Sequence, residues 1–248
     1  MLTSFLAHGW ASSPERWAIA AAVTIGFAVL AHALRGVNHS GALAGAAACF
    51  LLFTGGGPWA FATLSALFAM AWASTRMGYN RKLAMGLAER REGRNSGQVL
   101  GNLAVPALAS LAFSSTGDRI WLVAAVAALA EAATDTVASE IGQYRGSHTR
   151  MITTWKLVPA GTDGGITITG SLAGLIAGMG IVAIATASRM VPVAQAWVPL
   201  GAGFVGMLTD SVLGATLQRR GWMNNQAVNL FSTLAAAGLT FAVARLSS

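Results

Sequence analysis

Eight apolar segments, each roughly 17 to 25 residues long, constrain the fold of this chain more than any other feature. They cover residues 16–34, 37–54, 58–75, 98–114, 119–139, 166–188, 193–216 and 226–245. A helix of that length crosses the hydrocarbon core of a bilayer. Only 10% of the residues are charged, whereas a soluble domain has about 25%. The chain is therefore expected to be an integral membrane protein. A disulfide scaffold is excluded because Cys49 is the only cysteine.

The expected fold class is an all-α, polytopic membrane helical bundle of about eight transmembrane helices, which forms one domain over residues 1–248. Helices satisfy their own backbone hydrogen bonds in lipid, and no strand-like alternation or long repeat competes with them. Segment 37–54 is short and rich in Ala and Gly, so seven spans are an alternative. Gly170, Gly174 and Gly178 repeat every fourth residue, which favours close helix packing. Residues 1–10 are expected to form a short interfacial tail rather than a signal peptide.

The basic residues predict the orientation of the bundle. Sixteen Lys and Arg against nine Asp and Glu give a net charge of +7. In a soluble protein this excess would suggest nucleic acid, but in a membrane protein it fits basic cytoplasmic loops, so no nucleic-acid partner is expected. Twelve of the sixteen fall on one side and four on the other. The loops near 76–97, 140–165 and 217–225 are therefore predicted to be cytoplasmic, with both termini outside. The basic run 76–94 is interpreted as a solvated loop that faces anionic lipid.

Acidic residues within the spans are the first candidates for a functional site, because each costs roughly 2.5 to 3.5 kcal/mol in a bilayer. Asp135 and Glu140 lie at the cytoplasmic end of the fifth segment. Two carboxylates beside phosphate oxygens suit Mg²⁺, whereas helix caps or interhelical hydrogen bonds are the structural alternative. Glu140 lies well around the helix axis from Asp135, so both serve one site only if the helix end loosens or the bundle wraps around it.

A third acid, Asp210, lies at the same level in the seventh segment. Its helix face also carries Gly203, Gly206 and Gly214. This bare backbone suits either a close approach by phosphate or metal, or tight helix packing.

The loop 150–167 leads into the sixth segment and is rich in glycine. Glycines let successive N–H groups face an anion, and the helix start adds a favourable dipole. Arg150 and Lys156 would add positive charge for phosphates. The order of residues is not that of a Walker A loop. The candidate phosphate-binding residues of the loop are Gly161, Thr162, Asp163, Gly164 and Gly165.

Four amides at the same membrane level complete the candidate site: Gln98 and Asn102 in the fourth segment, and Asn225 and Asn229 in the last. They suit a nucleotide or a lipid phosphate. They suit interhelical hydrogen bonds, worth about 0.6 kcal/mol each, equally well.

Six blocks of sequence in order resemble the integral membrane family once catalogued as domain of unknown function ninety-two. The blocks are SGQVLGN from Ser96, ATDTVASEIG from Ala133, RMITT from Arg150, VPAGTDGGIT from Val158, DSVLGATLQ from Asp210 and NNQAVNL from Asn224. The family includes the chloroplast phytyl-phosphate kinase of vitamin E synthesis and is related to membrane enzymes that use CTP. The resemblance places this chain's Asp135, Glu140, Lys156, Gly161, Thr162, Gly164, Gly165, Asp210 and Asn225 at motif positions. Asp163 departs from the small hydroxyl residue expected there, so no essential base role is assigned to it.

The resemblance implies a kinase that transfers the terminal phosphoryl group of CTP, or another nucleoside triphosphate, to an isoprenoid monophosphate. In this hypothesis, Mg²⁺ is bound by Asp135, Glu140 and Asp210. The phosphates are bound by Arg150, Lys156 and the 161–165 loop, and a substrate headgroup is positioned by residues 224–229. These three acids and Lys156 are the expected catalytic residues. A cytidylyltransferase acting on a lipid phosphate and a small transporter are the alternatives, and a homo-oligomer is compatible with either chemistry.

Overall fold

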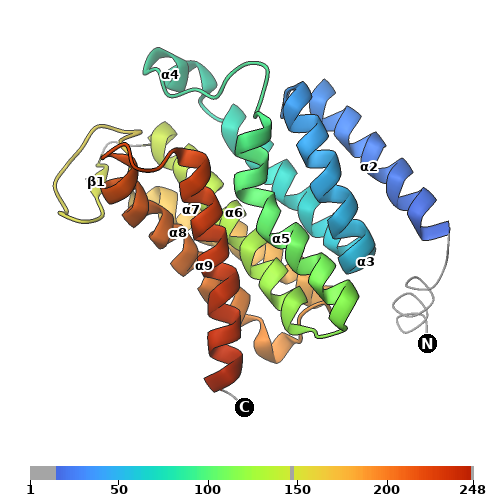
Figure 1. The fold of residues 1–248 in the computed structure, drawn as a ribbon. Coiled ribbons are helices and arrows are strands. Elements are labelled where there is room, and N and C mark those ends of the chain that lie inside the picture. Colours follow the sequence, from blue (N-terminus) through green and yellow to red (C-terminus); the bar gives the residue numbers. More distant parts are fainter. Residues whose placement is uncertain (1–14, 146–147, 247–248) are drawn as a thin grey trace.

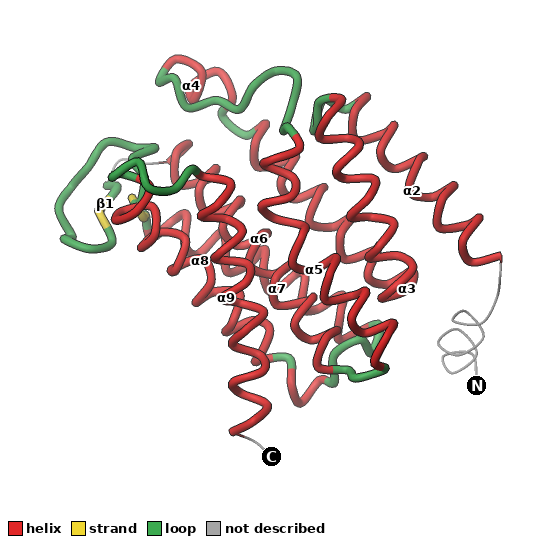
Figure 2. Tube along the Cα trace, viewed as in Figure 1, coloured by secondary structure: helices red, strands yellow, loops and turns green. Residues whose placement is uncertain are grey.

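Eight helices make up most of the computed structural model, which describes residues 15–145 and 148–246 (Figures 1 and 2). They are α2 (Glu15–Ala33), α3 (His39–Arg76), α4 (Tyr79–Ala84), α5 (Ser96–Thr116), α6 (Ile120–Arg145), α7 (Ile168–Ala187), α8 (Trp197–Leu213) and α9 (Asn225–Leu246). Two-residue strands β1 (Arg150–Met151) and β2 (Gly165–Ile166) pair antiparallel, and a π-helical turn (Gly214–Gln218) ends α8. The all-α bundle is confirmed. The tail predicted for residues 1–10 lies outside the described residues.

Seven of these helical segments are long and apolar enough to cross a membrane, and one of them, α3, is long enough for two crossings. Helix α3 has 38 residues, which would extend about 57 Å if straight. A bilayer core is only about 30 Å thick. Inside α3, Gly57 has φ 79° and ψ −173°, and Pro58 restarts the helix at a position where no N–H is required.

The second half of α3 returns to the level at which the first half began. Trp72 Nε1 and Arg76 Nη2 donate to Leu34 O, at 3.0 and 2.8 Å, although Leu34 precedes α3. Figure 1 shows the two halves as neighbouring antiparallel rods. The bundle therefore has eight crossings, and the predicted segments 37–54 and 58–75 are the two halves of α3.

Helix α6 is the central element, because it is buried along most of its length while the other spans expose apolar side chains. Its alanines permit close approach on several sides. A Cβ at Gly170, Gly174 or Gly178 of α7 would overlap Ala138 or Thr134 of α6. The predicted packing role of this glycine stripe is confirmed.

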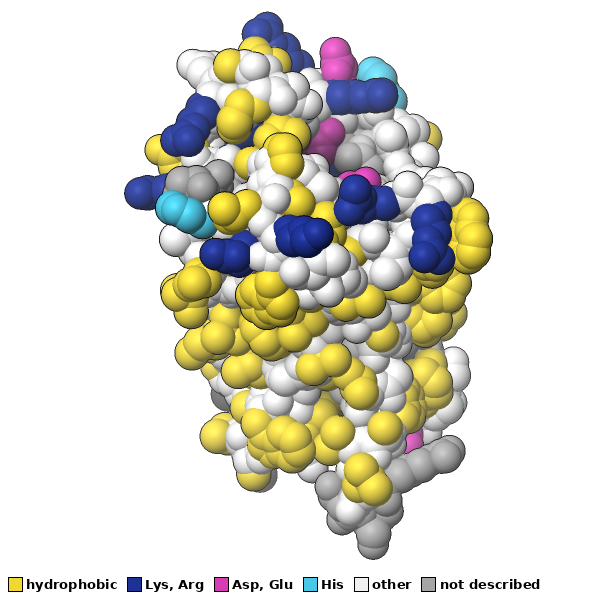
Figure 3. All heavy atoms as spheres, turned by 90° about the vertical axis from the view of Figure 1, so that its left-hand side faces the viewer, with side chains coloured by type: hydrophobic (Ala, Val, Ile, Leu, Met, Phe, Trp, Pro, Cys, Tyr) yellow, Lys and Arg dark blue, Asp and Glu magenta, His cyan; other side chains and the backbone are white. Residues whose placement is uncertain are grey.

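Charged side chains gather at one end of the bundle, as Figure 3 shows above a wide apolar surface. We call this the basic end. It carries the α2–α3 loop, the segment 76–95 with α4, the end of α6, the 148–167 loop and the α8–α9 turn, and these regions hold twelve of the sixteen Lys and Arg residues. The membrane face on which the basic end lies stays a prediction.

Candidate functional site

A polar pocket of about 140 Å³ opens at the basic end, between α6, the ends of α8 and α7, and the loop before α7. Asp135 of α6 and Asp210 of α8 both line it, and Asn225 reaches it from the start of α9. These three residues are distant in sequence and were expected to share a site. The fold brings them together because α8 and α9 both pack on α6.

An amide chain positions Asp210. The Asn229 side chain, oriented by its neighbours, donates to Asp210 Oδ2 at 3.1 Å and to Asn225 O at 3.0 Å. Its oxygen accepts from Asn102 Nδ2 at 3.1 Å. Ser232 Oγ lies 3.5 Å from the same Asp210 oxygen. Asn229 therefore hydrogen-bonds to the Asp210 carboxylate and does not itself line the pocket.

The glycine-rich loop is packed onto α8, so its glycines are required by contact as well as by conformation. Gly164 has φ 75°, and a Cβ there would overlap Ala215 in the π-helical turn after Asp210. A Cβ at Gly214 in the same turn would lie 2.9 Å from Gly164 N. This contact holds one wall of the pocket against the helix that carries Asp210, and π-helical turns of this kind are frequent at functional sites.

The start of α7 forms the neighbouring part of the wall. Thr167 caps this helix by accepting a hydrogen bond from Gly170 N at 3.0 Å. Thr162, Gly165 and Ser171 also line the pocket. A 20-residue helix thus directs its positive dipole end toward two carboxylates and toward any anion bound with them.

The two cations predicted to grip phosphates lie outside the pocket. Lys156 and Arg150 are exposed on the loop, and Arg150 Nη1 donates to Trp155 O at 2.8 Å. Asp163 does line the pocket. Burial raises the pKa of the Asp163 carboxyl above its ordinary value, and Arg219 opposes this shift. No Lys or Arg is among the described residues that line the pocket.

Glu140 is also separated from the two aspartates, although it lies on the same helix as Asp135. Its carboxylate forms a salt bridge with Lys82, and its Oε1 accepts from Thr75 Oγ1 at 3.0 Å. Lys82 is fully buried and also donates to Ser74 O and Thr75 O, at 3.2 and 2.8 Å. Sequence reasoning missed Lys82, because it is one cation in a basic run interpreted as solvated. Within the described ranges, no three His, Cys, Asp or Glu side chains are grouped closely enough to hold a metal ion by themselves.

Gln98 and Asn102 line a second, largely apolar pocket between α2, α3 and α5. Gln98 completes the capping box of α5, since its Oε1 accepts from the N–H of the N-cap residue Asn95 at 3.0 Å, and its Nε2 donates to Glu89 Oε2 at 2.9 Å. The predicted nucleotide-binding amides are thus divided. Asn225 lies at the polar pocket, Asn229 joins Asn102 to Asp210, and Gln98 faces the apolar pocket.

The fold and the pocket define a polytopic helical membrane protein with a two-aspartate polar site at its basic end. The chain belongs to a family described as "Integral membrane protein DUF92", whose model matches residues 22–237. The predicted family resemblance is confirmed.

Curated relatives come from several kinds of organism. An uncharacterized membrane protein of Synechocystis is 34% identical over 72% of this chain and 71% of its own length. Protein VTE6, chloroplastic, of Arabidopsis thaliana is 31% identical over 76% of this chain, and the match spans 60% of that relative. An uncharacterized membrane protein of Methanocaldococcus jannaschii is 32% identical over 69% of this chain and 70% of its own length. No solved structure matches this chain.

Proposed function

We propose that this protein is a membrane kinase that transfers the terminal phosphoryl group of a nucleoside triphosphate, CTP above all, to an isoprenoid monophosphate. The observation that carries the proposal is the meeting of Asp135 and Asp210 in one polar pocket beside the glycine-rich loop. Family membership supports the same chemistry, because the resemblance described above includes phytyl-phosphate kinases. A pocket at the basic end also lets a lipid tail stay in the bilayer while its phosphate meets nucleotide.

Two carboxylates suit Mg²⁺, which commonly takes one or two protein carboxylates and completes its octahedron with substrate phosphates and water. Asp135 and Asp210 would hold this ion, which would neutralise the charge on the transferring phosphoryl group. We leave Glu140 out of this set, because Lys82 and Thr75 already bind its carboxylate.

The chain's own groups then position the nucleotide. The backbone of Thr162 to Gly165 and the N-terminus of α7 would face the triphosphate, while Asn225 would donate a hydrogen bond to one of its phosphates. The exposed Lys156 and Arg150 would attract nucleotide to the loop from a distance. The acceptor phosphate needs no strong base, because its second pKa is about 6 and its oxygens are already ionised near neutral pH. Positioning and electrostatic stabilisation therefore carry the reaction.

The test supplies purified full-length protein with Mg²⁺, a panel of prenyl monophosphates, and CTP or ATP labelled separately in the γ- or the α-phosphate. A kinase passes only the γ-label to a lipid diphosphate and releases the nucleoside diphosphate. A cytidylyltransferase passes the α-label to the lipid and releases pyrophosphate. Transfer of the α-label would replace the kinase by the cytidylyltransferase, and lipid flux across sealed vesicles with no transfer of either label would favour the transporter.

A further inference from the structure

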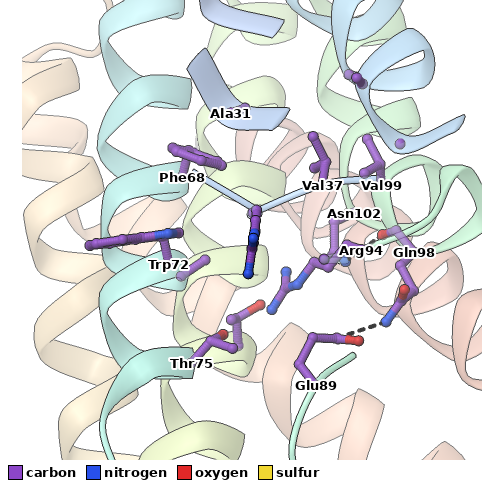
Figure 4. A pocket seen from close by; sticks show the side chains of 18 of the residues that line it. Ala31, Val37, Phe68, Trp72, Thr75, Glu89, Arg94, Gln98, Val99 and Asn102 are labelled. Carbon is purple, nitrogen blue, oxygen red and sulfur yellow. Dashed lines mark hydrogen bonds between the residues drawn. The ribbon is translucent and has the colours of Figure 1, made fainter. Parts of the chain in front are cut away.

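The second pocket has the size and lining of a small-molecule site. Its volume is about 350 Å³, within the range of roughly 300 to 1,000 Å³ typical of ligand pockets. Figure 4 shows apolar side chains from three parts of the fold around it, with Phe68 and Trp72 of α3 opposite Val37 and Val99. This apolar wall therefore suits a hydrocarbon and offers few hydrogen-bonding groups to a polar ligand.

The same pocket is strongly basic where it meets solvent, and we call this part its mouth. Five arginines line the pocket, and all but Arg94 are exposed: Arg35, Arg76, Arg90, Arg91 and Arg94. The only acid among the lining residues is Glu89, which accepts a hydrogen bond from Gln98 Nε2 at 2.9 Å. Arg76 is already engaged, because it donates to Leu34 O and lies 5.2 Å from the Trp72 ring. The remaining excess of positive charge predicts an anionic ligand.

Arg94 is the arginine best placed to bind that anion. Its side chain is partly buried, and Figure 4 shows the guanidinium extending into the pocket toward Thr75. Its backbone is fixed, since Asn38 N donates to Arg94 O at 3.0 Å and Arg94 N donates to Gly36 O at 3.0 Å. In the part of the chain that the structure describes, no hydrogen bond or salt bridge engages the guanidinium. A planar guanidinium next to an apolar wall favours a phosphate, which it can bind through two parallel hydrogen bonds.

The amides in this pocket argue against a nucleotide there. Both polar ends of the Gln98 side chain are occupied, by Asn95 N and by Glu89. Asn102 Nδ2 donates to Gln98 O at 3.0 Å and to the Asn229 oxygen at 3.1 Å. A base and a ribose would therefore lose hydrogen bonds with water against a wall that replaces few of them. An apolar chain that ends in one phosphate matches both the wall and the mouth.

We infer that this pocket is the acceptor site, where a single-chain isoprenoid phosphate monoester binds with its tail along α3 and its phosphate on Arg94. The inference rests on the proposed function and adds where, and through which residues, the lipid binds. The two pockets border α6 at neighbouring residues, since Thr136 lines the apolar one and Asp135 lines the polar one. Arg94 is close enough to Asp135 to interact with it electrostatically, and Asn102 and Asn229 connect this side to Asp210.

The test measures equilibrium binding of labelled phytyl monophosphate to the full-length protein in nanodiscs, without nucleotide. Unlabelled phytyl monophosphate should displace the probe, whereas inorganic phosphate, a five-carbon prenyl monophosphate and two-chain phosphatidate should displace it at least about 10-fold less well. Arg94→Gln should raise the Kd about 10-fold or more, because it removes the contact between the guanidinium and the lipid phosphate. The matched control is Arg220→Gln, which removes the same charge from an exposed position at the basic end outside the pocket.

A second variant tests the tail independently of the phosphate. Ala42 lines the pocket and is only partly buried, so Ala42→Phe should fill the space of the tail and weaken phytyl monophosphate about 10-fold, with inorganic phosphate unaffected. Equal displacement by phosphatidate or inorganic phosphate would overturn the inference, as would an Arg94→Gln variant that binds like Arg220→Gln. Failure here remains separate from failure of the proposed function. Lipid binding without phosphoryl transfer would keep this site and reject the kinase, whereas transfer with an unchanged lipid KM in Arg94→Gln would keep the kinase and reject this site.

Discussion

Asp135 and Asp210 each raise the free-energy cost of placing an apolar helix in a bilayer, but each also supplies a carboxylate to the polar pocket. Each lies within a membrane-spanning helix, where an ionised carboxylate calls for compensation. Asp210 has Asn229 and Ser232 beside it, and Arg94 lies within electrostatic range of Asp135. Asp210 therefore has hydrogen-bonding neighbours, and both carboxylates remain at the pocket.

Replacing either aspartate by Asn should abolish turnover and leave the fold intact. The amide keeps the shape of the side chain but removes a charged Mg²⁺ ligand, so we expect a loss above the roughly 10- to 100-fold typical of supporting residues around a metal. Phosphoryl transfer and its Mg²⁺ dependence are the measurements, with the melting temperature in detergent as a check on folding. Asp118→Asn, at the opposite end of the bundle, is the matched control. Retained turnover in both Asp135→Asn and Asp210→Asn would remove the metal assignment.

Lys82 and Glu140 are expected to affect stability rather than turnover, because they form an ion pair between a buried lysine and a partly buried carboxylate that joins α4 to α6. Lys82→Met leaves the carboxylate without its partner and should reduce the free energy of unfolding by about 3 to 5 kcal/mol. The double variant Lys82→Met with Glu140→Leu should recover most of that loss, since no unpaired charge remains. Thermal unfolding in detergent measures both effects.

The same double variant separates two roles for Glu140. If Glu140 only anchors α4, the double variant keeps phosphoryl transfer. If transfer is lost as completely as in Asp135→Asn while the melting temperature recovers, Glu140 belongs to the metal site after all.

Among elements, the hairpin inside α3 depends on one backbone conformation. Gly57 has φ 79° with an extended ψ, a region almost restricted to glycine, and a Cβ there would meet no atom within 4 Å. Gly57→Ala should therefore destabilise the protein by about 1 to 3 kcal/mol through strain alone. Gly26→Ala in α2, where space is also open and the backbone is helical, should cause no loss. Equal melting temperatures for the two variants would contradict the reversal at Gly57.

The α6–α7 contact depends on space rather than on conformation. A Cβ at Gly174 would overlap the Thr134 carbonyl oxygen, whereas one at Gly180 of the same helix would lie 3.8 Å from Met70 Sδ. Gly174→Ala should cost about 1 to 3 kcal/mol, the usual effect of overpacking, and Gly180→Ala should be close to neutral. Thermal unfolding of the two variants side by side tests this, and a neutral Gly174→Ala would show that the two helices can separate without penalty.

For the whole molecule, the basic end predicts the orientation in the membrane. Thr154 is exposed in the loop at that end, and Ser115 is exposed at the opposite end. Because the native Cys49 is buried, Thr154→Cys and Ser115→Cys should report labelling by a membrane-impermeant maleimide with little background. In intact cells, Ser115→Cys should react at once and Thr154→Cys only after permeabilisation. The reverse pattern would put the polar pocket on the outer face, away from cytoplasmic nucleotide.

The sequence by itself determined the class of fold and picked out the acids within the spans, although it left seven or eight crossings open and grouped Glu140 with the two aspartates. Long apolar segments can only become spans, and Asp135 and Asp210 are visible because charge is rare within them. Even the two halves of α3 are marked in the chain, by Gly57 and Pro58. These signals are local, so no knowledge of neighbours was needed.

Only the tertiary structure decided which polar groups meet. Glu140 is five residues from Asp135, which places it about 140° around an ideal helix, and α4 supplies a buried lysine on that side. The same packing divided the predicted amides between two pockets and gave the apolar one its arginines. The sequence specifies what each helix face carries, but the helix that will face it is decided by packing around α6, where backbones approach through glycine and alanine.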